Sequence, residues 1–129
     1  MPHITGLDAI RSKFGHWPDF HDAEVLRLFL DRTGPSLRMD LLMPAKAEPG
    51  QPRYRVDLVF ESIDAQEFSD FNHQNVLFSL TAEPVTEEHT VTGKVEDRLR
   101  VRLEASFGLH GSFTCTSAAA LLVEKGVDE

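Results

Sequence analysis

The sequence predicts an α+β domain that is mainly β, an antiparallel sheet or sandwich of six to seven strands with a short N-terminal helix. Apolar and polar residues alternate in most of the apolar stretches, which is the period of a half-buried strand. These stretches follow one another closely, with glycine or proline in several of the breaks, as is typical of hairpins. The length of 129 residues suits one core, so residues 1–129 are expected to form a single domain.

The N-terminal helix is predicted over residues 5–14. Thr5 is placed to cap it, because its hydroxyl can accept an N–H of the first turn. Leu7, Ile10 and Phe14 recur at the spacing that puts them on one helix face. That face is expected to pack against the sheet.

The first three strands follow from alternation and turn chemistry. The period changes to two at Ala23 and predicts a strand that ends near Asp31, where DRTGPS turns the chain. A second strand over 37–43 is expected to complete a hairpin with the first. The proline-rich stretch 44–52 is a loop, and a third strand follows over 53–60.

The middle of the chain is less regular. Residues 62–75 form the longest interruption of the strand pattern, with at most a helical turn near the centre. A fourth strand starts at Val76 and either ends at Pro84 or becomes a sheet edge there. A weak, solvated strand or hairpin is expected around 90–95.

The last third of the chain contains the most regular alternation, over 99–107, and therefore predicts a strand. Residues 112–116 predict another, with Phe113 and Cys115 facing inward. Residues 117–126 fit either a short C-terminal helix or a continuation of that strand, because periodicity does not separate the two.

Composition restricts the function classes. The formal net charge of −8 opposes nucleic-acid binding, which depends on cationic side chains, so no nucleic-acid partner is expected. One cysteine, Cys115, excludes an internal disulfide and fits a reducing compartment. The sequence shows neither a signal-peptide pattern nor the ~20 apolar residues of a membrane helix, so it predicts a cytoplasmic protein without a membrane partner.

The sequence contains no recognisable catalytic constellation. It has no glycine-rich phosphate loop, no G-x-S-x-G elbow and no His-Glu-x-x-His. Cys115 falls at an inward strand position, where a thiol is usually unreactive. We therefore predict that the protein is not an enzyme and uses no cofactor.

The segment FGHWPDFHDAEV, residues 14–25, concentrates aromatic, histidine and carboxylate side chains. It is interpreted either as a binding site or as a plug over the core. In a plug, Trp17 and Phe20 close the open end of the core, His21 is buried and donates to a carbonyl, and Asp22 accepts backbone N–H groups. The plug is the simpler interpretation.

The loop DFNHQN contributes Asn72, His73 and Asn75, which either contact a ligand or satisfy backbone groups where the chain enters the sheet. No spacing here matches a zinc motif. The candidate binding residues are Trp17, His21, Asp22, Asn72, His73 and Asn75. An alternative function, a small-ligand or metal-binding domain, would use four of them: His21, Asp22, Asn72 and His73.

Arginines recur at outward strand positions, either to bind an anion or, more simply, to pair with carboxylates on the same face. The arginines are Arg38, Arg53, Arg55, Arg98, Arg100 and Arg102, and the expected partners are Asp40, Asp57 and Glu104.

Three stretches, FGHWPDFHDAEVLRLFLDR, VDLVFESIDAQEFSDFNHQNVLFSL and GSFTCTSAAALLVE, carry a resemblance to a known family. The chain resembles the fiftieth family of bacterial immunity proteins, which belongs to polymorphic toxin systems. The resemblance implies a cytoplasmic protein that binds and neutralises a cognate toxin, with no catalytic residues to transfer. A homodimer is a further partner that the sequence leaves open.

Overall fold

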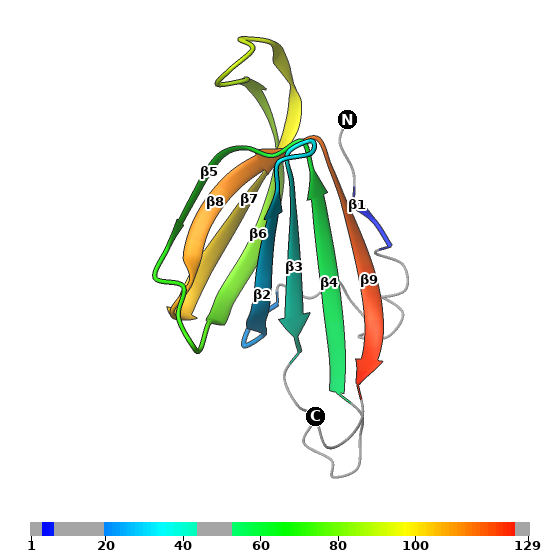
Figure 1. Cartoon of the computed structure of the whole chain (residues 1–129), viewed down its shortest axis with the longest axis vertical. Helices are drawn as coiled ribbons and strands as arrows, with labels where there is room; N and C mark the ends of the chain where they lie inside the picture. The colour runs from blue at the N-terminus through cyan, green and yellow to red at the C-terminus, as the bar shows by residue number, and fades with distance from the viewer. Residues whose placement is uncertain (1–3, 7–19, 44–52, 126–129) are drawn as a thin grey trace.

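The computed structural model describes residues 4–6, 20–43 and 53–125. These residues form one sheet of nine strands, in the spatial order β1-β9-β4-β3-β2-β6-β7-β8-β5 (Figure 1). β1 is parallel to β9, and the other neighbouring strands are antiparallel. The strands are β1 Ile4–Thr5, β2 Glu24–Asp31, β3 Ser36–Leu42, β4 Arg53–Glu61, β5 Asp64–Ser69, β6 Val76–Glu88, β7 Val95–Phe107, β8 His110–Cys115 and β9 Ser117–Lys125.

The mainly β, antiparallel part of the predicted fold class is confirmed, whereas the described residues contain no helix and more strands than predicted. Thr5, predicted to cap a helix, instead lies in β1 opposite Ala119 of β9. The rest of the predicted helix, residues 7–14, lies outside the described residues. Within the described ranges, no helix has the length and apolar character needed to cross a membrane.

The segment 62–75, predicted to interrupt the strand pattern, contains β5. A β-bulge between Asp64 and Glu67 shifts the register of β5 against β8, and Ala65 inside the bulge has a φ of 53°. The extra residue breaks the period of two that a strand normally shows. β5 also ends the sheet, so most of its side chains are exposed and no apolar stripe marks it. The predicted helical turn is therefore wrong.

The C-terminal alternative is decided in favour of a strand. β9 pairs with β4 along its whole length, with Ala118 opposite Phe60 and Ala120 opposite Leu58. Small residues on β9 leave room beside the large side chains of β4. The run of alanines, which suits a helix by intrinsic preference, is thus fixed as a strand by its neighbour.

Two stretches of chain pass from one half of the sheet to the other. β4 continues through a corner at Ser62 and Ile63 into β5, and β8 continues through Thr116 into β9. The Thr116 N–H donates to the Glu61 carbonyl at 3.1 Å, so the two crossings lie side by side. Figure 1 shows the result: β5 to β8 form one side of a curled sheet, and β2, β3, β4 and β9 form the other.

The core fills the inside of this curl. The inward residues of β2, β3, β4, β6, β7 and β8 supply most of it, and Phe60 meets Phe113 edge to face with the ring centroids 4.9 Å apart. Phe113 and Cys115 face inward as predicted, and both are buried. Other fully buried apolar side chains are Leu37, Met39, Leu41, Val56, Leu77, Val101 and Leu109.

The hairpin of β6 and β7 extends beyond the rest of the sheet (Figure 1). Its turn is closed by the His89 N–H, which donates to the Lys94 carbonyl at 2.8 Å, close to the hairpin expected around 90–95. Pro84 does not end β6 but pairs with Leu99 of β7. Among the described residues, β6 pairs with β2 at Val76 alone, so Pro84 lies at an edge of the sheet. Of the two predicted outcomes for Pro84, the sheet edge is therefore confirmed.

Candidate functional site

The two segments predicted from sequence to bind a ligand meet where β2 joins β6. The Asp22 N–H donates to the Leu77 carbonyl, and the Val25 N–H donates to the Asn75 carbonyl, both at 2.8 Å. The segment before β2 and the loop before β6 are therefore neighbours. Their ability to contact a partner depends on which of their side chains are exposed and not already hydrogen-bonded.

The first segment combines a buried residue with an exposed one. Phe20 is fully buried in the core, as the plug interpretation predicts. His21 is also predicted to be buried, and this is wrong: its side chain is 52% exposed. Its Nδ1 lies 2.9 Å from the Phe78 carbonyl, and its ring packs edge-on against the ring of Phe78. Trp17 lies outside the described residues.

Asp22 and His73 are both exposed. Asp22 has a φ of 65°, and its carboxylate lies 3.5 Å from Nε2 of His21. Among the described residues, no three His, Cys, Asp or Glu side chains are grouped so that they could hold a metal. The described residues therefore offer no metal-binding cluster that would support the alternative function, a small-ligand or metal-binding domain.

The second segment is held by its own amides. Oδ1 of the buried Asn75 accepts hydrogen bonds from the N–H groups of Asn72 and Leu109, both at 3.0 Å. Its Nδ2 donates to the Asn72 carbonyl at 2.8 Å. A Cβ at Gly108 would come within 2.6 Å of Asn75 Oδ1, so the turn before β8 needs glycine there. These contacts are what the backbone-satisfaction interpretation of the loop predicts.

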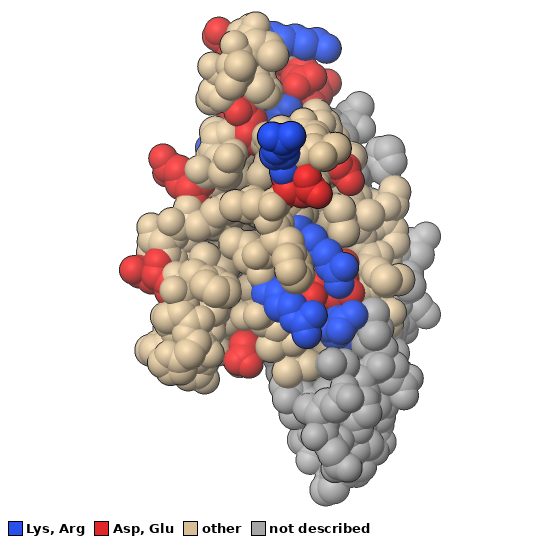
Figure 2. Space-filling model, viewed as in Figure 1, with Lys and Arg blue, Asp and Glu red and all other residues tan. Residues whose placement is uncertain are grey.

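A different group of side chains covers the outer face of β2, β3, β4 and β9. One row across the four strands is Arg27, Asp40, Asp57 and Leu121, each residue opposite the next. Asp40 and Asp57 are buried although they point away from the core. Figure 2 shows the basic side chains gathered around acidic ones over β3 and β4. We call this surface the arginine face; it comprises Arg27, Phe29, Arg38, Arg55 and Leu121 around Asp40 and Asp57.

Bidentate hydrogen bonds fix two guanidinium groups on the arginine face. Arg55 donates from Nε and Nη2 to the two carboxylate oxygens of Asp57, at 2.7 and 2.9 Å. Arg38 donates from Nε to Asp40 at 2.9 Å, and its Nη2 reaches Asp57 at 3.5 Å. These bonds raise the pKa of Arg38 and of Arg55 above its usual value, so both groups stay charged. The predicted pairing of arginines with Asp40 and Asp57 is confirmed.

Arg27, Phe29 and Leu121 are the residues of this face that were not predicted from the sequence. A bulge between Val25 and Arg27 shifts the phase of β2, so the simple alternation of leucines does not reveal which residues face outward. Phe29 lies opposite Arg38, whose guanidinium carbon is 5.8 Å from the centre of the Phe29 ring. The available signal was Arg27 itself, a charge inside an otherwise apolar strand.

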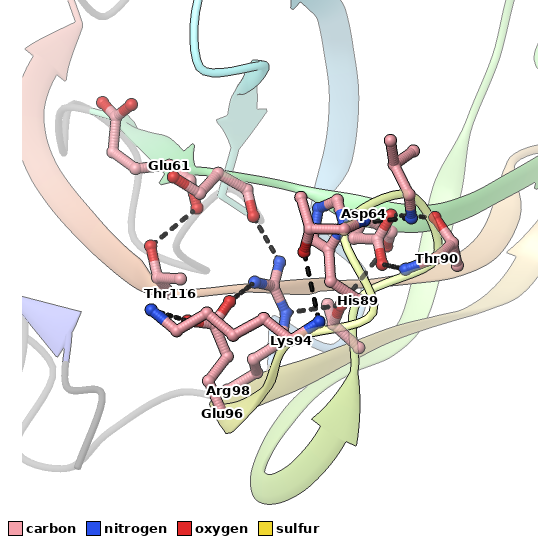
Figure 3. A network of polar contacts seen from close by, with 12 residues as sticks. Glu61, Asp64, His89, Thr90, Lys94, Glu96, Arg98 and Thr116 are labelled. Carbon is pink, nitrogen blue, oxygen red and sulfur yellow. Dashed lines mark hydrogen bonds and ion pairs between the residues drawn. The ribbon is translucent and has the colours of Figure 1, made fainter.

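A second polar network anchors the β6–β7 hairpin (Figure 3). Arg98, predicted at an outward strand position, lies on that side of the sheet but is buried, because the hairpin and the corner after β4 close over it. It donates to Thr114 Oγ1 at 2.9 Å, to Glu96 at 2.8 Å and to the Ser62 carbonyl. Glu104, the other predicted partner, is not used by the arginines of β7: Arg100 pairs with Glu87 and Arg102 with Glu83.

Asp64 connects the tip of the same hairpin to β5. Its carboxylate accepts hydrogen bonds from Thr90 Oγ1 at 2.5 Å and from the Thr90 N–H at 2.9 Å, and His89 lies 3.7 Å away. Burial alone would raise the pKa of Asp64, but the two bonds from Thr90 and the nearby His89 outweigh it and lower the pKa below its usual value.

Two shallow grooves flank this region. One, of about 370 Å³, lies between the hairpin tip and the start of β5, and another, of about 300 Å³, lies over β5, β7 and β8. Neither is lined by the predicted binding residues. The groove at the hairpin tip includes Asp64, whose oxygens are already occupied by Thr90.

Cys115 is a poor candidate for nucleophilic chemistry. Its side chain is buried in the core beside β7. Burial raises the pKa of the thiol to about 11, and the charge of Arg98 offsets this only in part. A thiol in this state forms little thiolate near neutral pH.

The model of a family described as Immunity protein 50 matches residues 6–118. No curated protein and no solved structure matches the chain.

Proposed function

Because this chain belongs to the immunity protein 50 family, we propose that it binds a cognate bacterial toxin and neutralises it by direct, non-catalytic association in the cytoplasm. The observation that carries the proposal is the family match, which covers residues 6–118. An inhibitor of this kind needs a stable scaffold and an exposed contact surface, and it needs no reactive group.

The residue types exposed on the described surface support the proposal. Affinity in such complexes is concentrated in a few residues, and the core of an interface is enriched in arginine and in aromatic side chains, including phenylalanine. The arginine face presents both types together on a rigid sheet. The only thiol is buried, which agrees with a protein that acts by occupancy rather than by chemistry.

The test is co-expression with a candidate toxin, chosen from the proteins encoded next to the gene for this chain. We expect growth of cells that carry both proteins, arrest of cells that carry the toxin alone, and co-elution of the two proteins in size-exclusion chromatography. A toxin from an unrelated system serves as the control and is expected neither to co-elute nor to be neutralised. Protection without any complex would contradict direct binding, and absence of both would contradict the immunity function.

A further inference from the structure

We propose that the arginine face is the toxin-binding surface and that the toxin presents a carboxylate-rich patch to it, with apolar side chains that cover Phe29 and Leu121. This inference rests on the proposed function and specifies the contact surface and the chemistry of the partner. Four structural observations lead to it.

The guanidinium groups at the centre are preorganised. Arg55 is bound to Asp57 through two hydrogen bonds, and Arg38 bridges Asp40 and Asp57. Their rotamers are therefore fixed before any partner arrives, which lowers the entropy lost on binding. A planar guanidinium held in this way keeps N–H groups that the aspartates do not use, and Arg38, whose side chain is 46% exposed, can offer them to a carboxylate of the partner.

The local charge is opposite in sign to the charge of the whole chain. Three arginines, Arg27, Arg38 and Arg55, surround two carboxylates, which leaves one net positive charge in this central cluster, and Glu24 lies at its edge, opposite Leu42. The chain carries −8 in total. A positive patch on an acidic protein orients an approaching partner so that its own acidic patch meets this face.

Arg27 keeps hydrogen-bonding capacity for a partner. Its side chain is 59% exposed, and its charge contact among the described residues is a 4.0 Å approach to Asp40. That distance is too long for a hydrogen bond. Asp40 is already held by Arg38, so Arg27 can turn toward a carboxylate of the partner without leaving Asp40 unpaired.

Apolar side chains flank the charged centre. Phe29 on β2 is 49% exposed, and Leu121 on β9 is 62% exposed. Apolar contacts that exclude water around a charged centre strengthen the ion pairs within it. The combination suits a folded protein surface better than nucleic acid, because a protein can confine its carboxylates to this small face, whereas a phosphate backbone would continue over the acidic remainder of the chain and be repelled there.

The experiment measures the affinity of the purified toxin-like protein for four single variants of the full chain. Arg27→Glu and Phe29→Ala alter the arginine face. Arg102→Glu is the matched control for the first, since Arg102 is 55% exposed and lies 3.9 Å from its partner Glu83 on the hairpin. Phe107→Ala is the control for the second, since Phe107 is 51% exposed and lies on β7.

We expect Arg27→Glu to weaken binding at least ~10-fold, as for a charge inside an interface, and both controls to stay within ~3-fold. Phe29→Ala should also weaken binding ~10-fold. Hydrogen exchange of the wild-type complex should slow in β2 and β3 and not in β5. Thermal unfolding of each variant shows whether it has folded. The hydrogen-exchange result does not depend on any variant.

Three outcomes would overturn the inference. If wild-type chain binds and Arg27→Glu binds as tightly as Arg102→Glu, the contact lies elsewhere while the proposed function stands. If wild-type chain binds no toxin, both proposals fail together. If a double-stranded DNA probe binds this face at physiological salt and Arg27→Glu abolishes that binding, the partner chemistry is wrong.

Discussion

Asp40 and Asp57 lie directly opposite one another on β3 and β4, and both are buried on the outer side of the sheet. Like charges opposite each other on neighbouring strands destabilise a sheet. Here Arg38 reaches both carboxylates and Arg55 holds Asp57 by two bonds. The charge cluster is therefore a single unit, and removing one cation exposes the repulsion that it normally offsets.

Replacing Arg55 with Met should lower the free energy of unfolding by about 2–3 kcal/mol, because Asp57 is left buried with only the distant Nη2 of Arg38. Urea denaturation at neutral pH measures the change. Arg102→Met, which removes an exposed arginine, is the control and should change stability by less than about 0.5 kcal/mol. Equal losses of stability in the two variants would show that the Arg55–Asp57 pair stabilises the fold no more than an exposed ion pair does.

Replacing Thr90 with Val should lower the free energy of unfolding by about 1–2 kcal/mol near neutral pH, since Asp64 loses a charge-assisted bond at a buried site. Thr86→Val removes a similar bond to Asp97 at an exposed position and should cost less. Urea denaturation of both variants provides the comparison. A larger loss for Thr86→Val would contradict a buried anchor at Asp64.

The same contact should make stability depend on pH. The pKa of Asp64 is lowered in the folded protein, so its contribution is complete above the ordinary carboxyl pKa of about 3.9 and is lost as the pH falls through the folded value. Wild-type chain should therefore lose stability in acid, and Thr90→Val should lose less over the same range. Denaturation between neutral pH and about pH 3 measures this, and parallel curves would contradict it.

Replacing Asn75 with Asp should destabilise the fold by about 2–3 kcal/mol, because the buried donor to the Asn72 carbonyl is lost and a charge is buried. Asn72→Asp alters an exposed amide of the same loop and should cost under about 1 kcal/mol. Thermal unfolding of both variants tests this. If Asn75→Asp is as stable as wild type, the buried amide is not what holds the loop.

Cys115 should react with a thiol reagent at pH 8 only when the protein unfolds, because burial raises its pKa to about 11. Labelling monitored by mass spectrometry should be slow in buffer and fast in denaturant. Fast labelling of the native protein would show that β7 and β8 open readily around it.

The sequence predicts elements well where one face is buried and the register is regular. β7 is the clearest case, because Leu99, Val101 and Leu103 alternate over a stretch that pairs on both sides. β5 could not be predicted in the same way, since its bulge breaks the alternation and its edge position leaves it polar. The choice between helix and strand for β9 could not be made from its own residues, because its pairing with β4 decides it.

Side-chain roles were predictable only when they depended on residues close in the chain. The pairs of Arg38 with Asp40 and of Arg55 with Asp57 follow from a spacing of two on one strand. The burial of Arg98 depends instead on the distant Ser62 corner and on the fold of the hairpin. Periodicity places Arg98 outward correctly, but it carries no information about what covers that face.

The passage of β8 into β9 has a consequence for how the molecule denatures. These strands are consecutive in the chain, and they pair with β7 and β5 in one half and with β4 in the other. Unfolding of either half therefore displaces one of these two strands, and the other strand, which is continuous with it, belongs to the opposite half. Loss of structure around Tyr54 on β4 and exposure of Cys115 on β8 should therefore follow the same cooperative transition.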